Sequence, residues 1–206
     1  MKKTILLPIF LILSACKVDT VIDVSTDQLR NETPENLTAS LYLEIPSCND
    51  YEDSRRESDS LVNAKAKTPQ LFKGAEYVEC FTQKMDTWAH FKIPVAIIKD
   101  SRSPVTDLNL VSNEFTLMGM AAKEDFVKRL EDENSRSYVS NDYYIEINLK
   151  TNDEFDIKVI SAYLQEHPYT IGTGTFKKDA TIKISLSDVS IDQLLTDHQV
   201  VILEYQ

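Results

Sequence analysis

Apolar and polar residues alternate along much of the chain. The clearest run covers residues 37–45, where the apolar residues all occupy odd positions: Leu37, Ala39, Leu41, Leu43 and Ile45. Because successive side chains of a strand point to opposite faces, a period of two predicts a β-strand with one face on a core. The other face would carry Thr38 and Tyr42 and would suit contact with a partner.

The same alternation predicts further strands over residues 143–149, 155–159 and 182–186, with Tyr143 on a contact surface. The polar residues 150–154 predict a hairpin turn between the first two. Less regular apolar runs predict strands at residues 18–24, 75–81, 88–98, 113–118, 170–176 and 199–205. Pro94 has no backbone N–H to donate, which predicts a sheet edge or bulge where a partner strand would add.

One segment has a clear helical period. Ala122, Phe126 and Leu130 recur every four residues, which predicts a helix over about residues 121–133. Short polar turns, rather than crossover helices, join the expected strands. The sequence therefore predicts an α+β fold, mainly antiparallel β-sheet, as one unit over residues 16–206 or as two packed halves with a boundary near residues 100–112.

A seven-residue segment occurs twice, at residues 23–29 and 188–194, with six of seven residues the same. In each copy a serine precedes a glutamine by three positions, which is the capping-box arrangement at a helix start. We therefore expect short helical turns after Ser25 and after Ser190. The favoured explanation of the repeat is that the chain uses the same local motif twice to pass from a strand into a helical turn. An ancient duplication is the alternative.

Composition limits the classes of protein that fit. The chain has 206 residues, of which 42% are hydrophobic and 27% charged, enough for a substantial core. Four glycines and three cysteines exclude a collagen-like chain and a disulfide-dense scaffold. The formal charge of −11 argues against a nucleic-acid partner, because such binding depends on cations at the phosphates.

The first sixteen residues combine a basic start, a short apolar run and small residues before a cysteine. Lys2 and Lys3 precede apolar residues 5–13, and Leu13-Ser14-Ala15-Cys16 follows. A buried core element is the alternative for the apolar run, which is too short to span a bilayer as a helix. The segment resembles the lipobox of bacterial lipoproteins.

This resemblance implies that residues 1–15 are a signal peptide removed by signal peptidase II, and that Cys16 carries a lipid such as palmitate. The mature chain would have 191 residues and a formal charge of −13, because both signal lysines are lost. In that family an aspartate after the cysteine is associated with retention at the inner membrane. Here Lys17 follows the cysteine, which implies the outer membrane of a cell envelope.

With Cys16 assigned to the lipid, Cys48 and Cys80 remain as an even pair in an oxidising compartment. We expect them to form a disulfide worth roughly 3 kcal/mol, and two separately buried thiols are the alternative. Residues 49–67 between them carry charges of both signs and no clear apolar period. They predict an exposed loop stapled at its ends, with a partner-recognition loop as the alternative.

The sequence contains no recognised catalytic, metal or cofactor motif. His90, His167 and His198 lie outside any nucleophile motif, and each fits a surface or half-buried histidine. Gly172 and Gly174 fit a bending β-ribbon better than a phosphate loop. We therefore expect no catalytic residues, no metal and no cofactor.

Two function classes follow. The first is a lipid-anchored, non-enzymatic binding or accessory protein of the bacterial envelope, attached to the membrane through Cys16 and contacting another envelope protein. A lipoprotein carried by a phage or mobile element also fits these features. The second is a periplasmic enzyme whose site assembles from scattered residues such as His90 or His198 with distant carboxylates. A histidine within reach of an acid in a deep pocket would favour the enzyme, and a grooved apolar surface would favour binding.

Overall fold

The computed structural model describes residues 17–136, 142–169 and 171–206. The expected signal peptide and the lipidation residue Cys16 lie outside these ranges. Within them, no helix has both the length and the apolar character needed to cross a membrane.

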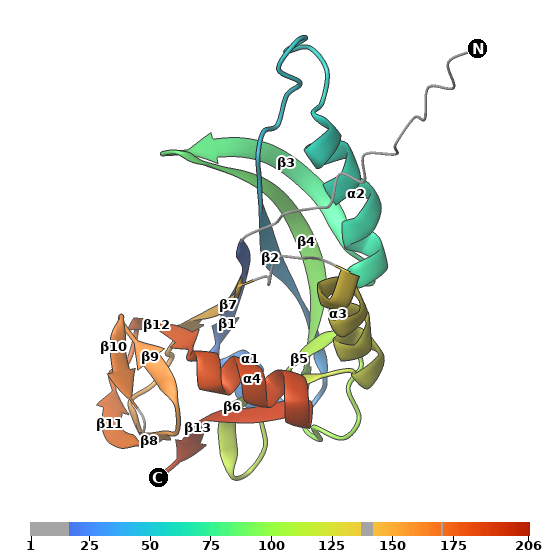
Figure 1. The fold of residues 1–206 in the computed structure, drawn as a ribbon. Helices are drawn as coiled ribbons and strands as arrows, with labels where there is room; N and C mark the ends of the chain where they lie inside the picture. Colours follow the sequence, from blue (N-terminus) through green and yellow to red (C-terminus); the bar gives the residue numbers. More distant parts are fainter. Residues whose placement is uncertain (1–16, 137–141, 170) are drawn as a thin grey trace, which may run out of the picture.

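The described residues form thirteen strands and four helices (Figure 1). The strands are β1 (Lys17–Ser25), β2 (Glu35–Ile45), β3 (Glu76–Gln83), β4 (Asp86–Ile98), β5 (Leu108–Val111), β6 (Thr116–Ala122), β7 (Asp142–Lys150), β8 (Phe155–Val159), β9 (Ala162–Leu164), β10 (His167–Tyr169), β11 (Gly172–Phe176), β12 (Thr181–Leu186) and β13 (Gln199–Tyr205). The helices are α1 (Thr26–Arg30), α2 (Asp59–Leu71), α3 (Glu124–Arg136) and α4 (Asp188–Asp197).

All the strands belong to one sheet, in the order β10-β9-β12-β7-β1-β2-β4-β5-β6-β13-β8-β11, with β3 added beside the first half of β4. The sheet curls until it is nearly closed and barrel-like. Strand β1 runs parallel to β7, and β4 runs parallel to β5, while the other described pairings are antiparallel. The predicted α+β class is therefore wrong: the fold is mainly β, because one continuous sheet builds the body and several short helices only cover it.

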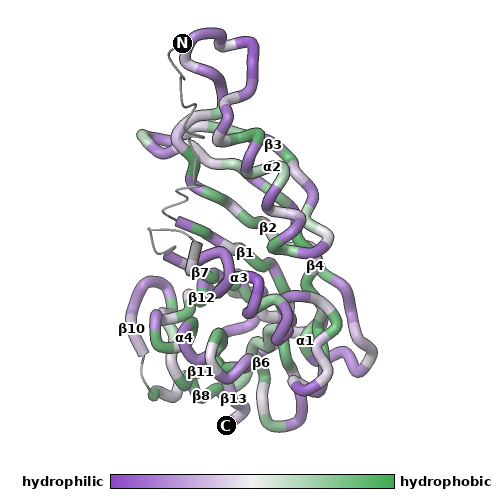
Figure 2. The backbone as a smooth tube through the Cα atoms, turned by 45° about the vertical axis from the view of Figure 1, so that its right-hand side comes forward, coloured by the Kyte–Doolittle hydropathy of each residue, from purple (hydrophilic) through white to green (hydrophobic). Residues whose placement is uncertain are grey.

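The main core lies on one face of this sheet, as the alternation predicted, and a small second cluster of Ala96, Ile98, Val111 and Ala121 is buried on the other face. In β2, Ala39, Leu41, Leu43 and Ile45 are buried, and each is separated from the next by a less buried residue. Helices α2 and α3 add apolar side chains to the same core, and α4 packs against β13. By contrast, the loop between β2 and α2 is hydrophilic (Figure 2).

Helix α2 occupies residues 59–67 of the segment predicted to be an exposed loop, nearly half of it. It begins where the Ser58 side chain accepts a hydrogen bond from the Leu61 N–H (3.1 Å). Its buried residues Leu61, Ala64 and Thr68 keep a helical spacing, but two of them are small or polar. The apolar signal was therefore too weak to reveal the helix, and the true loop is limited to residues 46–58.

The predicted helix over residues 121–133 begins too early. Ala121 and Ala122 complete β6 and pair with Asn109 and Leu108 of β5, so α3 starts at Glu124. A buried strand and a buried helix face are both apolar, and the pattern alone did not separate them.

The repeated segment forms two different helix starts. Ser25 and Gln28 make the predicted capping box, with the Ser25 N–H donating to Gln28 Oε1 (2.9 Å). The second copy does not: Ser187 caps α4, and Ser190 is a buried residue inside that helix. The Ser190 hydroxyl donates to the Ser161 carbonyl (2.8 Å), an acceptor that only the tertiary structure supplies. The predicted helical structure after Ser190 is present, but the predicted cap at Ser190 is wrong, because α4 already begins at Asp188.

The expectation of a free edge at Pro94 is also wrong. Strand β4 lies inside the sheet, with Thr38 of β2 opposite Pro94. On its other side, β3 pairs as far as Lys92 and β5 begins pairing at Val95. Pro94 therefore lies at the position where β4 changes its neighbour from β3 to β5, so that no backbone N–H is needed there for sheet pairing.

The predicted disulfide is confirmed. Cys48 and Cys80 are bonded and have a Cα–Cα distance of 5.7 Å. The bond joins the loop after β2 to strand β3, which has a sheet partner on one side only. It therefore restrains the outer part of the β3–β4 hairpin.

Replacing Cys48 with alanine should lower the free energy of unfolding by about 2–5 kcal/mol, because the unfolded chain loses a cross-link over a separation of 32 residues. Urea unfolding of the oxidised protein measures this change. Cys80→Ala is the matched control and should give the same loss, with no further loss in the double variant. Equal stability of the wild type and the single variants would contradict a stabilising role.

Candidate functional site

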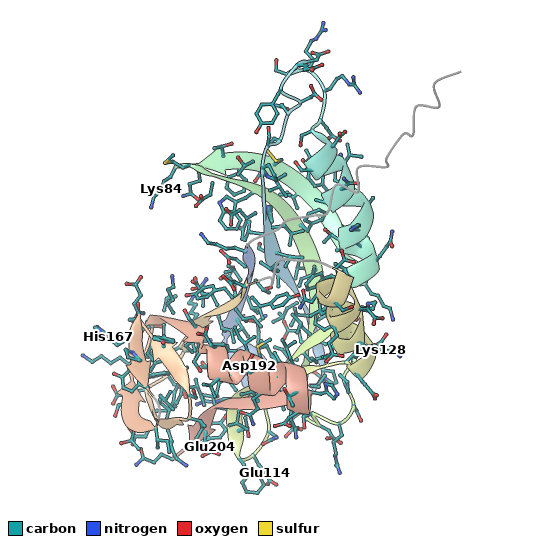
Figure 3. All side chains as sticks on the ribbon, in the orientation of Figure 1. Lys84, Glu114, Lys128, His167, Asp192 and Glu204 are labelled. Carbon is teal, nitrogen blue, oxygen red and sulfur yellow. A yellow bond between two sulfur atoms is a disulfide. The ribbon has the colours of Figure 1, made fainter. Side chains whose placement is uncertain are left out.

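An open groove of about 370 Å³ lies on the sheet face opposite the core. The alternation of each strand positions the residues of the groove. Asp19 and Tyr42 each lie between two buried residues of their strand, and Trp88 lies next to one buried residue. Lys84 marks the turn of the β3–β4 hairpin, which extends away from the rest of the molecule (Figure 3). We call this the hairpin groove; it is lined by Asp19, Val21, Tyr42, Phe81, Gln83, Lys84, Asp86, Trp88, Tyr144 and Glu146.

Four strands each contribute one aromatic ring to the groove: Tyr42, Phe81, Trp88 and Tyr144. Tyr42 contacts Phe81 edge-on at 6.2 Å between ring centroids and stacks on His90 at 4.6 Å. The Tyr144 hydroxyl donates to Ser185 Oγ (2.7 Å). These contacts fix several rings in place, and fixed aromatic surface is what protein interfaces favour.

A second cavity, of about 740 Å³, adjoins the groove. The two share Asp19 and Tyr144, and the second extends along β7 to α4, where Asp192 lies (Figure 3). It is less aromatic and more acidic than the hairpin groove, with Asp142 and Asp188 also in its wall. The two cavities together make an acidic track that begins at the hairpin and ends at α4.

Asp19 lies at the junction of the two cavities. Burial raises the pKa of its carboxyl group above the usual value, the charges of Glu146 and Glu44 raise it further, and Lys17 opposes them. Glu44 also has one buried carboxylate oxygen with no hydrogen-bond partner among the described residues. Glu146 is paired with Lys183 at 2.8 Å. The junction therefore holds negative charge that the protein only partly neutralises.

A serine, a histidine and an acid meet beside the groove. His90 Nε2 lies 3.2 Å from Ser40 Oγ, and His90 Nδ1 lies 3.8 Å from Glu79 Oε1. Burial lowers the pKa of His90, and Glu79 offsets only part of this effect. The imidazole is therefore neutral at pH 7 and able to act as a base.

The surroundings of this grouping do not suit acyl transfer. The Glu79 contact is longer than the hydrogen bond that orients a catalytic histidine. Ser40 is in the middle of β2, paired with Val21 of β1 and Lys92 of β4, so nearby backbone N–H groups point to neighbouring strands and not to a substrate. His90 is covered by Tyr42 and does not line the groove.

The other sequence candidates are dispersed. His167 is exposed on β10, and His198 ends α4 in a left-handed conformation (φ 59°). Gly172 and Gly174 lie in β11 and pair with β8, as predicted for a β-ribbon. In the described ranges, no group of three or more His, Cys, Asp or Glu side chains is arranged to hold a metal ion.

The three residues expected on one contact surface are separated. Tyr42 lines the groove, but Thr38 is opposite Pro94, toward the other end of β2. Tyr143 is on the core face of β7, where it is partly buried, and Tyr144 takes the groove position. The alternation over residues 143–149 contained this information, because Tyr143 shares the parity of Ile145.

Replacing Asp19 with asparagine should raise the melting temperature at pH 7, because the folded state no longer holds a poorly solvated carboxylate. The raised pKa means that the wild type loses stability as pH rises above the unfolded value, near 3.8. The advantage of the variant should therefore disappear at about pH 3, where both states of the wild type are protonated. Calorimetry at the two pH values measures it.

Asp23→Asn is the control, since Asp23 lies on the same face of β1 but already accepts a hydrogen bond from Asn148 (2.9 Å). It should give no such gain at pH 7. A loss of stability in Asp19→Asn at pH 7 would show that Asp19 is a structural residue.

Comparison with known proteins found a matching family model, but no matching curated protein and no matching solved structure. One family model, described as a domain of unknown function (DUF7424), matches residues 18–205, which include every described strand except the first residue of β1. The chain therefore belongs to the DUF7424 family.

Proposed function

We propose that this protein is a lipid-anchored lipoprotein of the bacterial envelope that binds another envelope protein through the hairpin groove and has no enzymatic activity. The observation that carries the proposal is the convergence of four aromatic rings on an open groove. Aromatic residues supply large contact area and dominate binding energy at interfaces. The groove is also open, and an open groove suits the binding of a partner protein better than the enclosure of a small substrate.

The place of the anchor in the sequence supports this proposal. Cys16 directly precedes Lys17, the first residue of β1, and Asp19 of the groove follows three residues after Cys16. At the rise of a β-strand, three residues cover only about 10 Å. A lipid on Cys16 would therefore hold the groove close to the membrane, and the partner would have to lie at the same surface. The lysine after Cys16 supports the outer membrane as that surface.

A periplasmic hydrolase is the second candidate, and the 3.2 Å contact between His90 and Ser40 is the observation that favours it. Binding is favoured over hydrolysis because the serine lacks nearby oxyanion donors and the histidine lies outside the groove. A serine-reactive fluorophosphonate separates the two candidates. If the probe labels the wild type and does not label Ser40→Ala, the proposal of a non-enzymatic protein is overturned.

The lipid anchor can be tested by replacing Cys16 with serine. The wild type should be recovered from membranes, and its mass should be that of a mature chain that begins at Cys16 and carries acyl chains. The variant should remain an unprocessed precursor, because signal peptidase II acts before a lipidated cysteine. An unmodified thiol at Cys16, or cleavage at another residue, would contradict the proposal.

The groove can be tested by replacing Trp88 with alanine. Crosslinking and pull-down of the lipidated wild type should recover a partner from its native envelope, and Trp88→Ala should reduce recovery about tenfold or more, as expected for a central aromatic contact. Phe115→Ala is the control, because Phe115 is an exposed aromatic residue (74%) that lies in the β5–β6 turn and does not line the groove. Equal loss in both variants would contradict a role for the groove.

Replacement of His90, His167 and His198 by alanine provides a further control. The triple variant should keep the phenotype if binding is the function, and it should still recover the partner, although less of it, because Tyr42 loses its stacking contact with His90. A folded triple variant that retains the partner but loses the phenotype would favour the enzyme.

A further inference from the structure

The charge of the hairpin groove and the adjoining cavity indicates what they would attract. Their walls contain three times as many carboxylates as lysines. The carboxylates belong to Asp19, Asp86, Asp142, Glu146, Asp188 and Asp192, and the lysines are Lys17 and Lys84. Of these acids, Glu146 has an ion-pair partner outside the two walls, Lys183. The track therefore favours a cationic ligand.

The carboxylate of Asp19 lines both cavities and is only partly compensated, and Glu44, which lines neither cavity, adds negative charge close to it. Asp19 is partly buried close enough to Glu44 and Glu146 for their charges to act on it. One oxygen of Glu44 is buried and accepts no hydrogen bond among the described residues. A cation bound beside Asp19 would offset the negative charge that these acids place at the junction of the two cavities.

Aromatic rings surround the same charges. Trp88, Tyr42 and Tyr144 line the groove together with Asp19. An ammonium or guanidinium group is attracted to the face of an aromatic ring, and indole is the most favourable of these rings. Rings and carboxylates in one groove therefore favour the same kind of group, a lysine or arginine side chain.

We propose that the hairpin groove binds a basic, extended segment of the partner, with a lysine or arginine side chain between Trp88 and Asp19. The inference rests on the proposed binding function and specifies the chemistry of the partner. A peptide segment fits because the groove is open and its acidic character continues past Asp19 to α4, so that a chain with several cations would find an acid at successive positions.

The single tryptophan of the chain is Trp88, so its fluorescence reports directly on the groove. The full lipidated protein in detergent is titrated with the synthetic peptide Ac-KAKAKAK-NH2, with its lysine-acetylated form, and with Ac-EAEAEAE-NH2. The lysine peptide should change the Trp88 emission saturably and should bind more weakly as salt screens the charges. The acetylated and glutamate peptides should have no effect.

Charge variants test the named residues in both directions. Asp19→Asn should weaken binding of the lysine peptide about threefold, and Asp19→Asn with Glu146→Gln about tenfold. Lys84→Gln should strengthen it, because it removes a positive charge from the groove wall. Asp156→Asn is the matched control, since Asp156 is an exposed acid on β8 outside both cavities, and it should leave the affinity unchanged.

Equal binding of the acetylated peptide, or no response to the lysine peptide, would overturn the cationic ligand. If Trp88→Ala still abolishes recovery of the envelope partner in that case, the proposed function stands with a partner of different chemistry. If recovery is also unaffected by Trp88→Ala, both proposals fail.

Discussion

The pairing of strand β1 with both β2 and β7 holds the sheet together and decides which residues line the groove. Strand β1 pairs in parallel with β7 over nine residues, from Lys17 to Ser25, but with β2 over only four, from Val18 to Val21. It therefore joins the two parts of the sheet, and its alternation commits Val18, Ile22 and the residues of the same parity to the core. The opposite parity leaves Asp19 and Val21 in the groove.

The groove arises from this short junction. The β3–β4 hairpin reaches out on the β2 side, and β7 lies on the other side of β1, so residues distant in sequence meet above it. Asp19 shows the consequence for stability, because its carboxylate is partly desolvated and next to other acids. The cluster of acids around Asp19 does not stabilise the fold. Residues that are unfavourable for stability are often kept because they take part in binding.

The sequence predicted the features that depend on neighbouring residues. Alternation in β2, the capping box at Ser25 and the pairing of Cys48 with Cys80 were all readable from residue type and spacing. Helix α2 was missed because its buried face includes Ala64 and Thr68. The groove was missed because no local pattern reports that Tyr144 and Trp88 line one groove; that arrangement depends on the order of strands in the sheet.

Site-specific photo-crosslinking in intact cells can show whether the groove is the contact surface of an anchored protein. A photoreactive amino acid in place of Tyr42 should form a discrete crosslinked product with one envelope protein. The same group in place of Phe115, in the exposed β5–β6 turn, should form none. A product from position 115 and none from position 42 would contradict the account.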